Sequence, residues 1–342
     1  MRQTWLSRRG STPGHYTYVT PRGKPVSARR SEQIDSLAIP PAWTDVHVSA
    51  AVRSAIQAWG FDARGRRQYR YHPDEIRKGQ QRKYYRVRQM GRDLPAIRRR
   101  VYSDFRKRGM PFEKVCAAIV RFLSDGFFRI GNDRYARENG TFGLTTLGKS
   151  HVKVHDDLIV FDYVGKRSIR HRQTVVSRDL ADFVKLLLRA PGARLFRYQD
   201  DDGRWHNVES GQVNDYLQDL AGFPYSAKDF RTWGGTLRAA TVLSDLGPAK
   251  TVRESKRNVA TAIRLVAAEL GNTPAICRKA YVHPIVIERY LGHGDTIELP
   301  ANRARRHAGS RATAHSPEES ALIDFLDRYF PERRKERRSE VD

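Results

Sequence analysis

Residues 251–271 constrain the fold more than any other stretch, because they specify where a helix begins, which face it buries and where it ends. Thr251 followed by Glu254 fits a capping box, in which each side chain binds the other residue's backbone N–H. Apolar residues then recur on one helical face, at Val259, Ile263, Val266 and Leu270. Gly271 belongs to the residue type that most often ends a helix. The sequence therefore predicts an amphipathic helix that stops at Gly271.

A second, shorter helix is predicted to follow at once. Thr273 suits its N-cap and Pro274 suits its first turn. Asn272 is then fixed at the corner between the two helices. Tyr281 comes nine residues later, and we expect it at the far end of the second helix.

The overall charge limits the kinds of molecule that the protein is expected to bind. Lys and Arg number 63 against 38 Asp and Glu, which gives a formal net charge of +25. Such an excess predicts a polyanionic partner, bound with an affinity that falls as the salt concentration rises. Nucleic acid is the expected polyanion. A membrane surface is the rival, but the sequence contains no run of about 18 apolar residues and no amphipathic stretch with a basic stripe.

Cysteine usage and the N-terminal residues bear on the compartment. Cys116 and Cys277 are too few for a disulfide framework or a thiolate zinc site. The first residues lack the apolar core of a signal peptide. We therefore expect an intracellular, cytoplasmic protein without a structural metal.

The chain is long enough for two domains. It has 342 residues, of which 39% are hydrophobic, and this is sufficient for a sizeable core. Short alternating stretches at 46–52 and 68–72 predict strands, whereas from about Lys83 the apolar residues recur at helical spacing. We place a β-rich N-terminal domain at 1–85 and a mostly helical domain at 86–342.

A small sheet interrupts the helical part. Alternation predicts strands at 151–154, 158–164 and 168–176, with a Gly165-Lys166 turn between the last two. The basic segments 303–311 and 333–338 are typical of a mobile loop and a solvated tail. The predicted fold class is α+β, with a small N-terminal β-sheet domain and a larger, mostly α-helical domain that contains a small antiparallel sheet.

Residues 143–150 match the P-loop pattern letter for letter, but their setting does not fit. A P-loop lies between a strand and a helix whose N-terminus binds the phosphates. Here the match is followed by the predicted strand at 151–154. Only seven residues separate Ser150 from Leu158, which leaves no room for a crossover helix. We therefore expect a loop that enters a hairpin, and no bound nucleotide.

Four short motifs follow one another along the chain. They are Phe128-Arg129-Ile130-Gly131-Asn132, Tyr163-Val164-Gly165-Lys166, Lys228-Asp229-Phe230-Arg231-Thr232-Trp233-Gly234, and Gly271-Asn272-Thr273-Pro274 followed by Lys279-Ala280-Tyr281. This order is the one seen in type IB DNA topoisomerases, and the chain resembles the compact poxviral and bacterial branch of that family from about Ile39 to Tyr290. The resemblance implies the catalytic fold that type IB topoisomerases share with tyrosine recombinases. It also implies a monomer at the bacterial nucleoid that relaxes supercoiled double-stranded DNA without a cofactor, a metal or ATP.

The resemblance assigns the central roles in strand cleavage to three of these residues. Tyr281 would attack phosphorus and form a 3′-phosphotyrosyl link, expelling a 5′-hydroxyl. Arg129 and Arg231 would clamp the phosphate, since a guanidinium keeps its charge and its planar fork matches phosphate oxygens.

Two further roles follow from the same resemblance. Lys166 lies in a hairpin turn, where the family keeps its general-acid lysine, and Lys149 and Lys153 are poorer candidates. Asn272 stands where many members have a histidine. An amide can donate a hydrogen bond to a nonbridging oxygen but cannot titrate, so we expect Asn272 to stabilise the transition state. A helix-junction cap is the alternative role for Asn272, and both roles can hold together.

DNA contacts are expected from both domains. In the first domain the candidates are Arg66, Arg67, Gln68, Tyr69 and Tyr71, which interleave basic with aromatic side chains. On a strand, Tyr69 and Tyr71 share one face, which either contacts DNA or packs inward. In the second domain the candidates are Arg134, Tyr135 and Lys228, and the sequence does not decide whether Arg134 and Tyr135 read bases.

Two other function classes compete with this interpretation. Tyrosine recombinases are the serious alternative, but they usually carry His-x-x-Arg at the second arginine, where this chain has Lys228 and Arg231. A non-catalytic DNA-binding protein is the third class. It would have no need of Tyr281 beside these cationic motifs.

Overall fold

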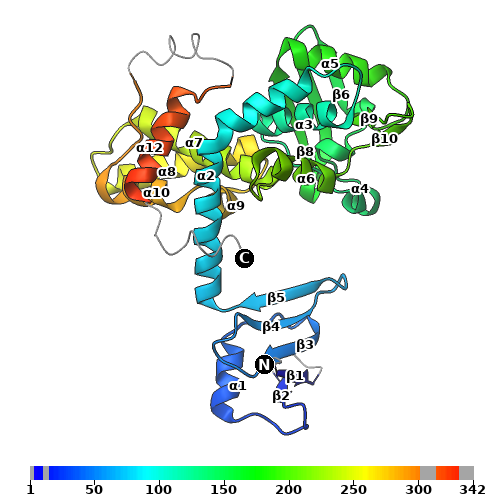
Figure 1. Cartoon of the computed structure of the whole chain (residues 1–342). Coiled ribbons are helices and arrows are strands. Elements are labelled where there is room, and N and C mark those ends of the chain that lie inside the picture. The colour runs from blue at the N-terminus through cyan, green and yellow to red at the C-terminus, as the bar shows by residue number, and fades with distance from the viewer. Residues whose placement is uncertain (1–3, 11–14, 301–312, 331–342) are drawn as a thin grey trace. The chain divides into compact units, whose positions relative to one another are not determined.

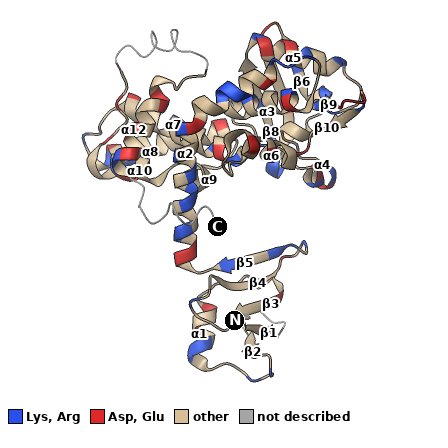
Figure 2. Ribbon diagram, in the orientation of Figure 1, with Lys and Arg blue, Asp and Glu red and all other residues tan. Residues whose placement is uncertain are grey.

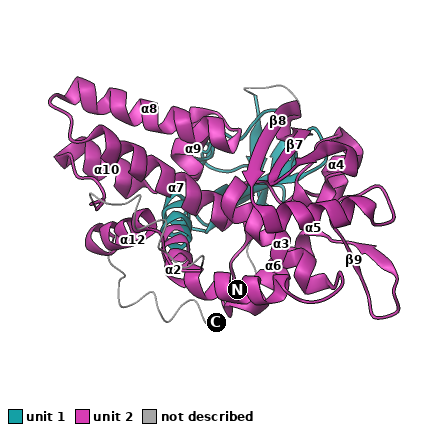
Figure 3. Ribbon diagram, turned by 90° about the horizontal axis from the view of Figure 1, so that it is seen from above, with its two compact units in different colours: residues 1–83 teal, residues 84–342 magenta. Residues whose placement is uncertain are grey.

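The computed structural model describes residues 4–10, 15–300 and 313–330 (Figure 1). The chain forms two compact units, residues 1–83 and 84–342 (Figure 3), and each is described by itself. The division falls two residues before the end of the expected N-terminal domain. The basic segments predicted at 303–311 and 333–338 lie outside the described residues.

The first unit is built on a five-stranded antiparallel sheet with the strand order β2-β1-β3-β4-β5. Its strands are β1 (Trp5–Arg9), β2 (Thr17–Val19), β3 (Thr44–Ser49), β4 (Ile56–Phe61) and β5 (Arg67–Tyr71). Helix α1 (Ala28–Asp35) begins at Ser27, whose side chain caps the backbone N–H of Arg30. The sheet and this helix share an apolar core of Leu6, Tyr18, Ile34, Trp43, Val46, Val48 and Ala58. The strands predicted at 46–52 and 68–72 are thus confirmed, although β3 ends earlier, at Ser49.

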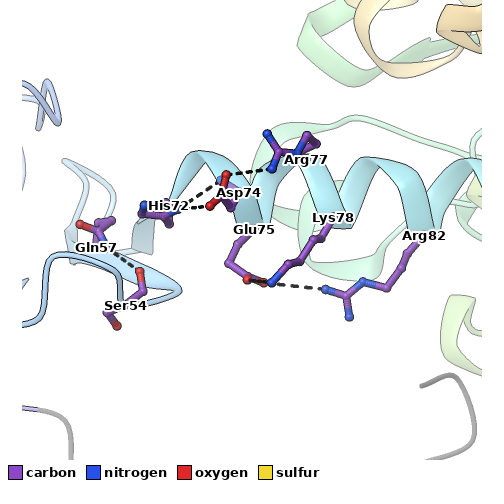
Figure 4. Close-up of polar contacts among 8 residues, drawn as sticks. All are labelled: Ser54, Gln57, His72, Asp74, Glu75, Arg77, Lys78 and Arg82. Atoms are coloured by element: carbon purple, nitrogen blue, oxygen red, sulfur yellow. Dashed lines mark hydrogen bonds and ion pairs between the residues drawn. The ribbon is translucent and has the colours of Figure 1, made fainter. Parts of the chain in front are cut away.

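Helix α2 (Pro73–Phe105) begins ten residues before the helical pattern was expected to start. The helix begins at Pro73, a residue type favoured at the first helical position. The acidic Asp74 and Glu75 follow in the first turn, where negative charge is favoured by the helix dipole. Most side chains of residues 73–83 are exposed, so this stretch has no apolar periodicity from which a helix could be predicted. Figure 4 shows its surface ion pairs, Asp74 with Arg77 at 3.1 Å and Glu75 with Lys78 at 2.8 Å. Such exposed pairs contribute little to stability.

The second unit is mostly helical. Beyond the shared helix α2, its described α-helices are α3 (Phe112–Gly126), α4 (Asp133–Asn139), α5 (Arg178–Arg189), α6 (Ser210–Ala221), α7 (Ala227–Leu246), α8 (Val252–Leu270), α9 (Pro274–Ala280), α10 (Pro284–His293) and α12 (Pro317–Tyr329). Its antiparallel sheet has the order β6-β7-β8, from β6 (Val152–His155), β7 (Leu158–Gly165) and β8 (Ile169–Val176). The predicted α+β fold class is confirmed. A hairpin of β9 (Arg197–Gln199) and β10 (Trp205–Asn207) was not predicted.

An aromatic cluster joins the sheet to the helices. The ring of Phe161 on β7 meets Phe122 of α3 edge-on, with centroids 5.3 Å apart, and meets Phe128 at 4.9 Å. All three side chains are fully buried. Edge-to-face contacts of this kind fix ring orientation as well as burying area. The cluster therefore anchors the loop after α3, and Arg129 is the next residue in that loop.

The P-loop match proves to be a loop. Leu144–Thr146 and Lys149–His151 form two short 3-10 turns, and the chain then enters β6, which pairs antiparallel with β7. The ammonium of Lys149 donates to the carbonyl of Ala190. This arrangement confirms the loop that enters a hairpin. Across the three described stretches of the chain, no helix is long and apolar enough to cross a membrane.

Candidate active site

The corner between α8 and α9 forms as the sequence predicted. Thr251 caps α8 by accepting from the N–H of Glu254 at 3.1 Å, and Gly271 ends the helix with a φ of 57°. Thr273 caps α9, which ends at Tyr281. One detail differs, since the Glu254 carboxylate accepts from the backbone N–H of Lys250 at 2.8 Å and does not complete the capping box.

Arg231 lies on α7 and points its guanidinium at the end of α8. Only 4% of the residue is exposed. Its Nη2 donates to the carbonyl of Leu270 at 2.7 Å, and its Nη1 donates to the carbonyl of Phe127. Burial, and next the charge of Arg129, lower the pKa of Arg231 to about 10. The guanidinium is therefore still protonated at neutral pH.

Arg129 reaches the same helix end from the loop after α3. Its Nη2 donates to the carbonyl of Gly271 at 2.9 Å and to Oδ1 of Asn272 at 2.7 Å. Burial is the main cause that lowers the pKa of Arg129. The last carbonyls of a helix carry partial negative charge. Two guanidinium groups are thus held side by side at a helix C-terminus, where their mutual repulsion is offset.

Tyr281 sits directly beside this pair. The guanidinium carbon of Arg231 lies 5.2 Å from the centre of the Tyr281 ring, and the residue is half-buried. The hydroxyl of Thr236 on α7 donates to the Thr232 carbonyl at 2.7 Å, lies 3.4 Å from the Tyr281 carbonyl oxygen and accepts from the N–H of His283 at 3.0 Å. These contacts hold the backbone from the Tyr281 carbonyl to His283 against α7, the helix that carries Arg231.

The side-chain amide of Asn272 contacts the cluster through its oxygen. Its Oδ1 accepts from Arg129, while its Nδ2 is buried and has no hydrogen-bond acceptor among the described residues. The backbone N–H of Asn272 donates to the carbonyl of Ala267 at 3.0 Å, so the residue also completes the end of α8. A donor held in place without an acceptor suits a ligand oxygen.

Lys166 lies in the turn between β7 and β8. The turn consists of Lys166–Ser168, and two of its residues have positive φ, Arg167 at 68° and Ser168 at 57°. Lys166 is exposed, and the described contacts do not join it to the other four predicted catalytic residues. The structure therefore brings together Arg129, Arg231, Asn272 and Tyr281, with Lys166 on the adjoining hairpin.

The sequence interpretation missed His171 on β8. Its Nε2 lies 3.2 Å from Nη1 of Arg129, and only 8% of the residue is exposed. Alternation could have indicated it, since His171 is two strand positions from Gln173 and four from the buried Val175. The partner of the His171 side chain depends on how β8 packs against α8 and the loop after α3. A local sequence pattern does not predict such packing.

The predicted DNA-binding strand β5 presents both tyrosines outward. Tyr69 is 38% exposed and Tyr71 is 48% exposed, so the inward packing left open by the sequence is wrong. The guanidinium of Arg67 lies 3.8 Å from the centre of the Trp59 ring and 5.5 Å from that of Tyr69. His47 stacks on Trp59 at 4.1 Å. Trp59 and His47 thus extend the aromatic surface beyond the residues that the sequence singled out.

Other predicted DNA contacts are partly engaged within the protein. Asp62 holds Arg66 by an ion pair of 2.7 Å and accepts from Gln68 at 3.0 Å. In the second unit, Arg134 on α4 pairs with Glu138 at 2.8 Å, and Tyr135 is 47% exposed. Lys228 is exposed in the first turn of α7. Lys and Arg are spread over both units (Figure 2).

Comparison with known proteins identifies the family. Residues 74–307 match the family model described as eukaryotic DNA topoisomerase I, catalytic core, and residues 15–62 match bacterial DNA topoisomerase IB, N-terminal domain. DNA topoisomerase 1B of Acanthamoeba polyphaga mimivirus is 31% identical over 283 residues, which cover 80% of this chain and 83% of the relative. The chain belongs to the type IB DNA topoisomerases.

Two further viral topoisomerases align with most of the chain as well. DNA topoisomerase 1 of Rabbit fibroma virus is 28% identical over 244 residues, covering 70% of this chain and 73% of the relative. DNA topoisomerase 1B of Vaccinia virus (strain Copenhagen) is 24% identical over 236 residues, covering 67% and 70% respectively. Both matched family models are topoisomerase models, which favours the topoisomerase over the recombinase alternative. As a member of this family, the chain is an isomerase that acts on DNA.

Proposed function

We propose that this topoisomerase relaxes supercoiled double-stranded DNA by cutting one strand through Tyr281 and resealing it. The phenol oxygen forms a bond to phosphorus as the bond from phosphorus to the 5′-oxygen breaks. The product is a 3′-phosphotyrosyl ester and a free 5′-hydroxyl. Because the ester retains the energy of the broken bond, resealing requires neither ATP nor another energy source. The cluster of Tyr281, Asn272 and two arginines around the end of α8 is the observation that carries this proposal.

Arg129 and Arg231 are proposed to neutralise the phosphate as charge gathers on its oxygens. Both are anchored by helix-end carbonyls, so little reorganisation is needed when DNA binds. Removing one preorganised donor of this kind commonly lowers a rate by about 100- to 1000-fold. The same positive charge favours attack by Tyr281, since a phenol is a weak nucleophile until its proton is lost.

Asn272 and Lys166 are proposed to act on two different oxygens of the scissile phosphodiester. Asn272 would donate its unpartnered Nδ2–H to a nonbridging oxygen. Lys166 would give a proton to the leaving 5′-oxygen, while the phenol proton is released to solvent or a nearby base. Neither role requires a metal ion. Among the residues that the structure describes, no cluster of three or more His, Cys, Asp or Glu is arranged to hold one.

We propose that the first unit contributes to binding through its outer strand. Arg67, Tyr69 and Tyr71 are directed outward on β5, and the net charge of +25 favours contact with phosphates along the duplex. Arg66, Gln68, Arg134, Tyr135 and Lys228 are proposed as further contacts. We further propose a monomer that acts on chromosomal DNA in the cytoplasm, at the nucleoid, and the match to a bacterial N-terminal domain supports the bacterial setting.

Plasmid relaxation tests this function directly. Wild-type enzyme should relax supercoiled plasmid in EDTA without ATP, and Tyr281→Phe should not. Tyr102→Phe is a matched control, because Tyr102 is an exposed tyrosine on α2 outside the cluster. Relaxation by Tyr281→Phe would overturn the assignment, and so would recombination of paired DNA sites without relaxation.

A further inference from the structure

His171 forms the third described contact of Arg129. Its Nε2 lies 3.2 Å from Arg129 Nη1, while Nη2 of the same guanidinium donates to Gly271 and Asn272. An arginine has five N–H groups. Three are then directed at protein acceptors, and two remain for phosphate oxygens.

The position of the imidazole is tightly defined by its neighbours. The ring stacks on Tyr163, its cross-strand partner on β7, with centroids 5.4 Å apart and planes 22° from parallel. Two glycines from different elements border it. A Cβ on Gly271 would stand 2.7 Å from Nδ1 of His171, and a Cβ on Gly165 would stand 2.7 Å from Nε2. The imidazole therefore fills a space that neither glycine could share with a side chain.

The surrounding charges favour the neutral ring. Burial first, and then the charges of Arg129 and Arg231, lower the pKa of His171 to about 4. Tyr163 faces the ring from β7, and the open groove beside it is lined by Asp125, Arg170, Arg172 and Glu269. At neutral pH the ring is uncharged, so Nε2 can accept from Arg129 if Nδ1 carries the proton.

We propose that His171 is a positioning residue for strand cleavage, whose neutral imidazole accepts through Nε2 and fixes the plane of the Arg129 guanidinium against the scissile phosphate. The proposal rests on the proposed role of Arg129. A protonated ring could not accept and would place a third cation beside two arginines. The guanidinium would then be free to rotate about its long side chain, and misplacement by about 1 Å can lower a rate about 100-fold.

Two substitutions separate positioning from core packing. His171→Phe keeps a flat ring of similar size but has no acceptor, whereas His171→Gln offers an amide oxygen near the position of Nε2. Each is compared with the full-length wild-type enzyme in single-turnover cleavage of a DNA duplex, with duplex affinity and the thermal midpoint measured in parallel. We expect His171→Phe to cleave about 10- to 100-fold more slowly with little change in affinity, and His171→Gln to recover most of the rate.

A double-mutant cycle with Arg129→Ala tests whether the effect passes through the arginine. If His171 acts by positioning Arg129, adding His171→Phe to Arg129→Ala should cause almost no further loss. A methylphosphonate at the scissile position gives a second measure, because it removes the negative charge that the arginine neutralises. The rate ratio between wild type and His171→Phe should shrink on that substrate.

Several outcomes would overturn the inference. They are wild-type cleavage by His171→Phe, no recovery in His171→Gln, and full additivity with Arg129→Ala. If His171→Phe does not fold, His171→Leu takes its place as the variant without an acceptor in the same three comparisons. Failure of the proposed function is distinguishable, since the wild-type enzyme would then not cleave the duplex, and failure of the proposed role of Arg129 alone would leave Arg129→Ala cleaving at the wild-type rate.

Discussion

Gly235 and Tyr281 are packed so closely that no side chain fits between them. A Cβ on Gly235 would stand 2.8 Å from the Tyr281 carbonyl oxygen and 3.4 Å from the Tyr281 Cβ. Real Cβ atoms essentially never approach a backbone oxygen to 2.8 Å. The backbone of helix α7 at Gly235 therefore limits where Tyr281, the proposed nucleophile, can lie. Gly235 is four residues after Arg231 on the same helix.

Gly235→Ala should displace Tyr281 and slow cleavage. We expect a loss of about 100-fold in the single-turnover rate, because in-line attack tolerates little misplacement, while the affinity for duplex DNA stays near wild type. Gly211→Ala is the matched control, since Gly211 also lies in a helix, α6, and a Cβ there would meet no atom within 4 Å. Equal cleavage rates in the two variants would show that this contact does not position Tyr281.

Lys166→Ala should be rescued by a better leaving group. If Lys166 protonates the 5′-oxygen, its removal should slow cleavage of ordinary DNA by about 100- to 10,000-fold. A bridging 5′-phosphorothiolate needs no acid, because its sulfur leaves as a thiolate. Cleavage of that substrate should therefore be close to wild type in Lys166→Ala. A variant that remains slow on the phosphorothiolate would exclude Lys166 as the acid, and Lys149→Ala serves as the lysine control.

Arg66 and Arg67 are adjacent in the chain but have different contacts, so their alanine variants should differ in how strongly DNA binding depends on salt. Arg66 is paired with Asp62 at 2.7 Å, whereas Arg67 rests on the Trp59 ring and has no such carboxylate contact described. Arg67→Ala should lower the salt dependence of DNA binding by about one unit of slope, as expected for one lost phosphate contact. Arg66→Ala should change the slope less. Titration of duplex binding against salt measures both, and the reverse order would contradict the outward role of Arg67.

The corner at Asn272 was predictable because its determinants are local. Thr251, Gly271 and Thr273 each specify a helix end through their own backbone or side-chain geometry. The first turns of α2 were missed because an exposed helix carries no apolar stripe. The hairpin of β9 and β10 was missed because strands of three residues give too short an alternation.

The contact of His171 with Arg129 and the shared anchoring of the two arginines could not be predicted, for a different reason. Arg129 and Asn272 are 143 residues apart in the chain, and Arg231 and Leu270 are 39 apart. Such contacts depend on how β8, α7 and α8 pack, which no local pattern reports. The motifs indicated which residues matter, but not that two guanidinium groups share the end of one helix.

The neutral state of His171 predicts a pH dependence of stability. Burial and the two arginines lower its pKa in the folded protein from 6.5 to about 4, so the unfolded chain binds a proton more readily between these values. The contribution of this residue is therefore fully present above about pH 6.5 and is lost as the pH falls toward about 4. The thermal midpoint of wild type should fall across this window more steeply than that of His171→Phe. Parallel curves for the two proteins would contradict the lowered pKa.

The covalent intermediate tests the central claim most directly. A duplex whose cut strand cannot be resealed should trap the enzyme on DNA, and digestion of the complex followed by mass spectrometry identifies the attached residue. We expect a nucleotide linked through its 3′-phosphate to Tyr281, formed in EDTA without ATP. An adduct on another residue, or one joined to the 5′ end of the break, would contradict the assignment of Tyr281 as the nucleophile.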